Sequence, residues 1–186
     1  MTPTPKIAKG SRALLKKLTF VLGGAASGKS AWAEGLVTGS GLSPVYLATA
    51  EAGDHEMRAK IARHAARRDE RWRLIEVPLD IAGALRGLGR DDGCLIDCAT
   101  LWLGNLMGTG RDPAAAAHDL LAALDASSAR VVVVSNEVGQ GIVPADALSR
   151  RFREAQGRLN AQLAAQADLV VQVIAGLPLV LKGQLP

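Results

Sequence analysis

The chain has 186 residues, of which 48% are hydrophobic and 22% charged, and its formal net charge is +4. This composition excludes a disordered chain, and no apolar run approaches the roughly 18–20 residues that a membrane-spanning helix needs. Without the five Lys and Arg residues at positions 1–17, the body has 17 Lys and Arg against 18 Asp and Glu, so we expect no nucleic-acid partner.

Residues 1–17 contain no acid and lack the apolar core and cleavage pattern of a secretory signal. We expect them to be a basic flexible extension of a cytoplasmic protein. Cys94 and Cys98 belong to one expected strand, which would place them about 13 Å apart at ~3.3 Å per residue. That separation is too large for a disulfide, so we expect two reduced thiols.

An apolar run at Leu18–Leu22 precedes the glycine-rich sequence GGAASGKS at residues 23–30. The run is typical of a buried strand, and a helical pattern follows from Ala31. In this context the sequence predicts a phosphate-binding P-loop, whose glycines allow positive φ and a close approach of backbone N–H groups to a phosphate. Lys29 would reach the β- and γ-phosphates, and the Ser30 hydroxyl would bind Mg²⁺.

Strand and helix patterns alternate along the rest of the chain. We expect strands at 18–22, 45–49, 73–77, 93–98, 130–135, 169–174 and 179–182, and helices at 31–37, 54–68, 81–88, 101–107, 113–126 and 146–167. This order predicts an α/β fold, with a mostly parallel central sheet, helices on both faces and an antiparallel edge strand at 179–182. Residues 18–186 would form a single nucleotide-binding catalytic domain, with its ligand at the carboxyl ends of the strands.

Two strand ends carry polar residues that suit this ligand. Asp97 ends an apolar strand, as a Walker-B carboxylate does, and would bind Mg²⁺ beside Ser30; a helix cap or a turn is the structural alternative. Residues 136–141, NEVGQG, follow the VVVV strand. They suit either substrate binding or a turn that needs positive φ.

The helix expected at 54–68 carries an excess of cations. Its spacing places one histidine on a face with three of them: His64 with Lys60, Arg67 and Arg68. Such a face would bind a polyphosphate and favour a neutral, nucleophilic imidazole. A solvated basic face is the simpler interpretation, and the residues alone favour it.

Several longer motifs carry more information than the P-loop. They are VYLATA at 45–50, DHEMRAKIARHAARR at 54–68, LIDCATLWLGN at 95–105, NEVGQGIVP at 136–144 and RRFREAQGRLN at 150–160. With GGAASGKS they resemble the family of bifunctional adenosylcobinamide kinases / adenosylcobinamide-phosphate guanylyltransferases of cobalamin biosynthesis. The resemblance covers nearly everything from Leu18 to Lys182. The family usually has Arg where this chain has Ala26.

The resemblance implies two reactions in a RecA-like P-loop enzyme that forms homotrimers. A kinase phosphorylates the aminopropanol hydroxyl of adenosylcobinamide with ATP or GTP, and a guanylyltransferase then moves GMP from GTP onto that phosphate through a GMP-histidine intermediate. By motif position His64 is this histidine, with Lys29 as the second catalytic residue. The implied nucleotide contacts are Gly23, Gly24, Ala25, Ala26, Ser27, Gly28, Lys29, Ser30, Ala48, Thr49, Ala50, Ala65, Ala66, Arg67, Arg68, Glu76 and Asp97, with Ser30 and Asp97 also binding Mg²⁺.

Two other functions remain open on the sequence. A small-molecule kinase without guanylyl transfer would need the P-loop and Asp97 but not His64. A non-catalytic, nucleotide-gated regulator would bind nucleotide without turnover, and the intact Lys29-Ser30 pair together with Asp97 argues against it.

Overall fold

The computed structural model describes residues 15–51, 53 and 55–186, with the side chains of Glu56 and Lys60 left out. Most of the expected extension, residues 1–14, and the first residue of the helix expected at 54–68 lie outside this part of the chain. Leu15 is buried, and its carbonyl accepts a hydrogen bond of 2.5 Å from Arg130. The chain therefore already packs against the body at residue 15.

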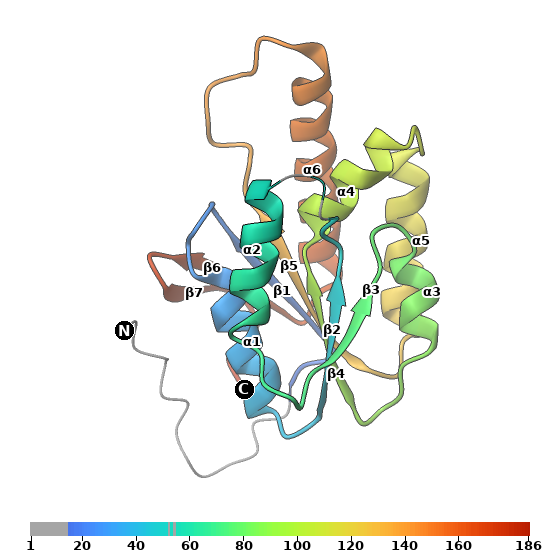
Figure 1. The fold of residues 1–186 in the computed structure, drawn as a ribbon, viewed down its shortest axis with the longest axis vertical. Coiled ribbons are helices and arrows are strands. Elements are labelled where there is room, and N and C mark those ends of the chain that lie inside the picture. Colours follow the sequence, from blue (N-terminus) through green and yellow to red (C-terminus); the bar gives the residue numbers. More distant parts are fainter. Residues whose placement is uncertain (1–14, 52, 54) are drawn as a thin grey trace.

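The described residues form one seven-stranded sheet with the spatial order β3-β2-β4-β5-β1-β6-β7 (Figure 1). The strands are β1 (Leu18–Gly23), β2 (Ser43–Ala48), β3 (Arg73–Glu76), β4 (Asp92–Asp97), β5 (Arg130–Asn136), β6 (Leu169–Ile174) and β7 (Leu177–Lys182). All neighbouring strands pair in parallel except β6 and β7, which are antiparallel. The carboxyl ends of six strands consequently meet at one edge of the sheet.

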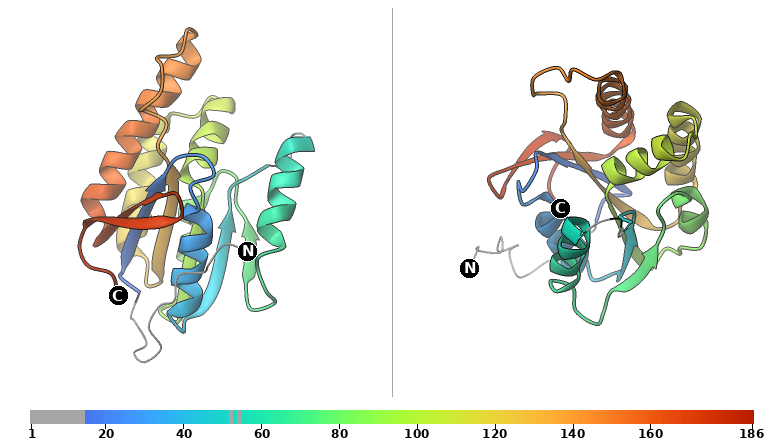
Figure 2. Two further views of the ribbon diagram at one scale, coloured as in Figure 1. Left: turned by 90° about the vertical axis from the view of Figure 1, so that its left-hand side faces the viewer. Right: turned by 45° about the horizontal axis from the view of Figure 1, so that its top comes forward.

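Helices cover both faces of the sheet, as Figure 2 shows. They are α1 (Lys29–Gly39), α2 (His55–Ala65), α3 (Ile81–Arg86), α4 (Ala99–Gly108), α5 (Pro113–Ala126) and α6 (Ala147–Gln166). The buried side chains of α3 to α6 share one core cluster, and those of α1 belong to a second. Among the described residues, no helix has the length and apolar character that a membrane span requires.

The residue pattern explains this arrangement. Along β5, Val131 and Val133 join one core cluster whereas Val132 and Val134 join the other, so the VVVV run is buried on both faces. The longest helix, α6, begins after Asp146, whose carboxylate accepts the N–H of Ser149 at 2.7 Å and so caps the helix.

The predicted fold class is confirmed, including the antiparallel edge strand, but several element ends differ by one to three residues. Helix α1 begins at Lys29 and takes in the end of the P-loop, whereas α2 ends at Ala65 rather than near residue 68. Strand β7 begins at Leu177, because Ala175 and Gly176 have φ of 51° and 81° and form a tight hairpin turn. Pro178 is tolerated within β7 because this strand lies at the edge of the sheet.

Candidate functional site

The glycine-rich turn predicted as a P-loop joins β1 to α1 at the carboxyl edge of the sheet. Gly28 has φ of 91°, and a Cβ there would lie 3.1 Å from the Cα of Gly176 in the β6–β7 turn. At position 23 there is no room for a side chain, because a Cβ there would lie 2.6 Å from Ser27 Oγ. Gly23 and Gly24 do not have positive φ, so that part of the prediction is wrong for these two glycines, whereas Ala26 adopts φ of 54°.

A cavity of about 780 Å³ lies between this turn, the ends of β2 and β4, and α2. Of the predicted site residues, the cavity is lined by Ala25, Ala26, Ser27, Gly28, Lys29, Ser30, Ala48, Ala50, His64, Arg67, Arg68, Glu76 and Asp97. The other five do not line it: Gly23, Gly24, Thr49, Ala65 and Ala66. Thr49 is buried, and its hydroxyl bonds the N–H and the carbonyl of Cys98, each at 2.8 Å. Its side chain therefore holds the backbone that follows Asp97.

Asp97 is contacted by side chains from two other elements of the cavity, β2 and α2. Its Oδ2 accepts a hydrogen bond of 2.7 Å from the Tyr46 hydroxyl and lies 3.4 Å from Nδ1 of His64. Burial alone would raise the pKa of the Asp97 carboxyl, but hydrogen bonds from His64, Tyr46 and Ser30 outweigh burial and hold that pKa below its ordinary value. Asp97 is therefore an ionised carboxylate at neutral pH. Burial and this charge together raise the pKa of the Tyr46 phenol, which stays protonated and donates.

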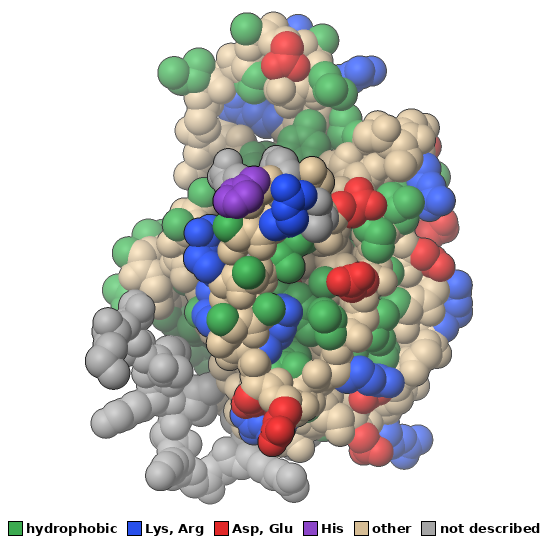
Figure 3. All heavy atoms as spheres, viewed as in Figure 1, with side chains coloured by type: hydrophobic (Ala, Val, Ile, Leu, Met, Phe, Trp, Pro, Cys, Tyr) green, Lys and Arg blue, Asp and Glu red, His purple; other side chains and the backbone are tan. Residues whose placement is uncertain are grey.

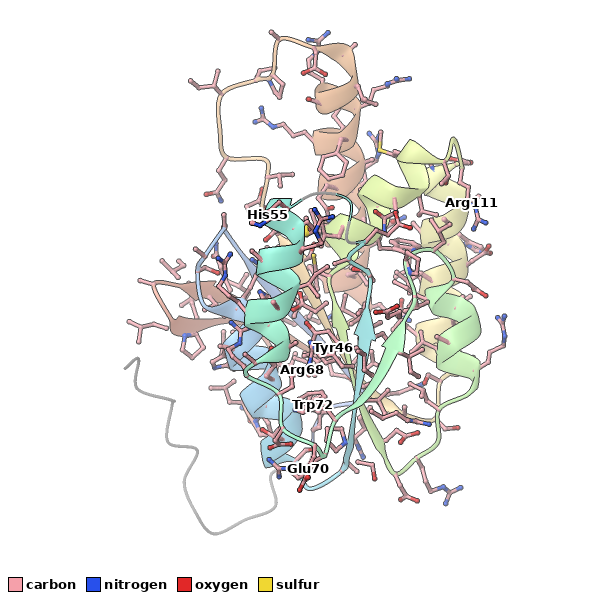
Figure 4. The ribbon with its side chains drawn as sticks, viewed as in Figure 1. Tyr46, His55, Arg68, Glu70, Trp72 and Arg111 are labelled. Atoms are coloured by element: carbon pink, nitrogen blue, oxygen red, sulfur yellow. The ribbon has the colours of Figure 1, made fainter. Side chains whose placement is uncertain are left out.

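The two arginines that follow α2, Arg67 and Arg68, each contact a side chain from another element. Arg67 donates two hydrogen bonds to the Glu34 carboxylate of α1, at 3.1 and 3.2 Å. Arg68 stacks on the ring of Tyr46, with its guanidinium carbon 3.8 Å from the ring centroid (Figure 4). Ligand atoms of Glu34, His64 and Asp97 all lie within 4.8 Å of one another. Two carboxylates, those of Glu34 and Asp97, thus lie beside the His64 imidazole, which the helical spacing did not predict.

Sequence reasoning missed Glu34, Tyr46 and Asn136, which contact or line the cavity. The rarity of the residue type could have drawn attention to two of them: Glu34 is the only acid among the first 50 residues, and Tyr46 is the only tyrosine in the chain. Asn136 was considered only as a member of the polar segment after β5.

The pair predicted to bind a metal does come together. Ser30 and Asp97 both line the cavity, and the Ser30 side chain is among the groups that lower the pKa of the Asp97 carboxyl. A hydroxyl and a carboxylate are the hard oxygen ligands that Mg²⁺ prefers, so the donor set fits this ion.

These features define a class of protein. A G-x-x-x-x-G-K-S turn follows the first strand of a parallel sheet, and a carboxylate ends a strand that is separated from it by one other strand, β5. This is a P-loop nucleotide-binding protein with a RecA-like core. The solved structure of the ATPase EscN, from the type III secretion system of enteropathogenic Escherichia coli, has a similar fold, with a TM-score of 0.56 at 12% identity over 86% of this chain and 43% of that one.

The sequence identifies the family within this class. Residues 19–181 match the family described as cobinamide kinase / cobinamide phosphate guanyltransferase. The chain is 45% identical over 169 residues to the bifunctional adenosylcobalamin biosynthesis protein CobP of Pseudomonas aeruginosa, covering 89% of this chain and 97% of that protein. It is 36% identical over 181 residues to CobU of Escherichia coli, covering 89% and 99%. The chain belongs to this family, which confirms the prediction of a bifunctional enzyme with corrinoid and nucleotide substrates.

Proposed function

We propose that a single cavity serves both reactions and that His64 is the residue that carries GMP between GTP and the corrinoid. The observation that carries this proposal is the position of His64, which lines the same cavity as the P-loop with Nδ1 3.4 Å from the buried Asp97. A nucleotide whose phosphates lie on the P-loop would therefore lie beside the imidazole.

The P-loop is the proposed binding site for the β- and γ-phosphates of ATP or GTP. Its backbone N–H groups and the amino end of α1 favour an anion. Lys29 is mostly buried, and its Nζ donates to the Gly24 carbonyl at 3.0 Å, within the turn that would surround the phosphates. In the kinase reaction the hydroxyl of adenosylcobinamide attacks the γ-phosphorus, and Lys29 stabilises the charge that develops on the transferred group.

In the guanylyltransferase reaction the imidazole of His64 acts as the nucleophile. Because Asp97 lies beside Nδ1, Nε2 is the nitrogen that attacks the α-phosphorus of GTP. The Nε2–P bond forms as the P–O bond to the bridging oxygen breaks, and pyrophosphate leaves with the electron pair. A phosphate oxygen of adenosylcobinamide phosphate then displaces His64, giving adenosylcobinamide-GDP. The Asp97 carboxylate stabilises the positive charge of the substituted imidazole.

Ser30 and Asp97 are the residues that would hold Mg²⁺, which when bound neutralises charge on the phosphates. The remaining nucleotide contacts proposed here lie at the ends of β2 and β3 and after α2: Ala48, Ala50, Arg67, Arg68 and Glu76.

We also propose that the enzyme is a cytoplasmic homotrimer, as the family resemblance implies. Two unpaired, buried cysteines support a reducing compartment. The edge strand β7 supports assembly, because Leu177, Leu179 and Leu181 are 71%, 52% and 53% exposed along an unpaired edge. Sedimentation equilibrium gives the mass directly; a monomer would contradict the trimer and leave the chemistry untouched.

The chemistry is tested by incubating the protein with Mg²⁺ and [α-³²P]GTP and then adding adenosylcobinamide phosphate. We expect a covalent label that survives denaturation, release of pyrophosphate, and loss of the label to the corrinoid. His64→Ala should abolish the label and keep the kinase activity, whereas the control His118→Ala, on exposed α5 surface, should label normally. A label that persists in His64→Ala would contradict the assignment of this residue, and kinase activity without any label would favour a simple kinase.

A further inference from the structure

The segment Glu137–Leu148, which we call the arm, comprises the connection from β5 to α6 and the first two residues of α6. It stands above the carboxyl edge of the sheet together with the following turns of α6 (Figure 1; Figure 2, left). Apolar side chains lie on its outer surface: Ile142, Val143 and Leu148 are 97%, 65% and 57% exposed. Figure 3 shows several hydrophobic side chains on the surface of this projecting lobe, interspersed with charged ones. Exposed apolar groups that cluster on one projection are typical of a binding surface.

The arm keeps this shape through its own hydrogen bonds. Arg150 of α6 donates to the carbonyls of Pro144 and Ala145, at 2.9 and 2.5 Å. Arg153, one turn further along α6, donates to the carbonyl of Gly139. These contacts fix the backbone while leaving Ile142 and Val143 in solvent. A preordered surface of this kind loses little conformational entropy when a ligand binds.

The base of the arm is continuous with the nucleotide cavity. Asn136 lines the cavity and pairs in register with Gly23, and the next residue, Glu137, donates its N–H to the Gly23 carbonyl at 3.1 Å. Two buried polar atoms at this base have no hydrogen-bond partner among the described residues: Asn136 Oδ1 and Arg153 Nη1. Buried polar atoms without partners point to a ligand or water that completes the site.

We propose that the arm is the docking surface for the corrin macrocycle of the acceptor, and this inference rests on the proposed function. A cavity of about 780 Å³ is the size of one small-molecule site, so a bound nucleotide leaves no room for a macrocycle. Only the side chain that bears the reactive hydroxyl or phosphate enters, and the ring lies outside the cavity at the same edge. The periphery of a corrin carries methyl groups and carboxamides. Ile142 and Val143 match the methyl groups, and the unpartnered polar atoms of Asn136 and Arg153 at the base of the arm match polar groups of the side chain that enters.

The test measures binding apart from chemistry. Binding of adenosylcobinamide is measured by equilibrium dialysis, with the visible absorbance of the corrinoid as the readout. The wild type is compared with the double variant Ile142→Ser/Val143→Ser. Leu185→Ser is the control, since Leu185 is 47% exposed near the C-terminus, at the opposite end of the molecule (Figure 2). We expect the double variant to bind the corrinoid about tenfold or more weakly and to have a similarly raised KM for it in both reactions. The control should behave like the wild type, and labelling by GTP alone should be equal in all three.

Two results would overturn the inference. One is equal corrinoid binding by the double variant and the wild type. The other is a lower oligomeric state of the double variant in sedimentation velocity, which would assign the arm to a second copy of the chain. Failure of GTP labelling in the wild type, with weakened corrinoid binding in the double variant, would instead contradict the proposed function and leave the docking surface standing. Because both substituted side chains are exposed, the variants should unfold at the wild-type temperature, which a thermal scan checks.

Discussion

Asp97 connects the nucleotide chemistry to the stability of the protein at the scale of single residues. Its carboxylate is contacted by Tyr46 from β2 and by His64 from α2, and the Ser30 side chain of the P-loop also lowers its pKa. A buried charge is tolerated only when hydrogen bonds replace its lost hydration. The contacts that compensate for the burial of this carboxylate also hold the His64 imidazole at the cavity.

Replacing Tyr46 by Phe tests how much one of these contacts contributes. The substitution removes the hydroxyl that donates at 2.7 Å but keeps the ring, which packs on Arg68 and on Trp72 at 5.9 Å. Because Asp97 retains its other partners, we expect a loss of about 1–2 kcal/mol in the free energy of unfolding, measured by urea denaturation. An unchanged midpoint would mean that the phenol contributes nothing to holding Asp97.

The two cysteines should be inert in the folded protein. Cys94 and Cys98 are 0% and 5% exposed, and burial raises the pKa of both thiols. At pH 8 both thiols therefore stay protonated and shielded, and a disulfide reagent such as DTNB should not react with the native protein. In guanidinium chloride it should titrate both. A thiol that reacts rapidly in the native state would show that β4, or its junction with α4 at Cys98, opens easily.

Among the elements, α2 is attached to the body differently from the other helices. None of its described side chains is buried. Among the contacts that hold α2 and the turn after it are three between side chains: His64 with Asp97, Arg67 with Glu34, and Arg68 with Tyr46. An element held by few buried contacts opens at low free-energy cost, and α2 is therefore the segment best able to reposition His64 when nucleotide binds.

The interaction free energy between Arg67 and Glu34 can be measured by a double-mutant cycle with Arg67→Ala and Glu34→Gln. Amide exchange of α2 should speed up in each variant, and the two effects should couple by about 0.5–1 kcal/mol, because the Arg67 side chain is 40% exposed. Arg71→Ala is the control, since Arg71 pairs only with the exposed Asp69 nearby. Additive effects on exchange would show that the pair does not hold α2.

Elements that depend on local sequence were predictable. The strand–glycine turn–helix unit at residues 18–39 is encoded by adjacent residues, and the buried VVVV strand needs only its own pattern. The end of α2 was not predictable from helical spacing, because Arg67 and Arg68 leave the helix to reach partners on α1 and β2. Those partners are far away in sequence, and helix propensity does not reflect them.

For the whole molecule, the order of strands in the sheet brings the site together. The β2 and β4 strands are paired, so Tyr46 and Asp97, 51 residues apart, meet at 2.7 Å. The sequence predicted both strands and the carboxylate at the end of β4, but not the strand order. Glu34 and Tyr46 were missed for this reason, whereas the residues of the P-loop could be named individually.

Nucleotide binding should stabilise the entire fold, because the cavity is built from elements across the sheet. A ligand that binds only the native state raises the free energy of unfolding by RT ln(1 + [L]/Kd), which is about 2.7 kcal/mol at a ligand concentration of 100 times Kd. Mg²⁺ and GTP should therefore raise the unfolding midpoint of the wild type, while Lys29→Ala should show little shift and lose both activities. Equal shifts in the two proteins would place the nucleotide away from the P-loop.

A crystal structure with Mg²⁺ and the α,β-methylene analogue of GTP tests most directly whether one cavity holds both the phosphates and the nucleophile. The analogue prevents cleavage at the α-phosphorus and so traps the complex before GMP transfer. We predict its terminal phosphates on the backbone N–H groups of residues 24–30 and Nε2 of His64 facing its α-phosphorus. Phosphates bound elsewhere, or His64 turned away from the nucleotide, would contradict the account.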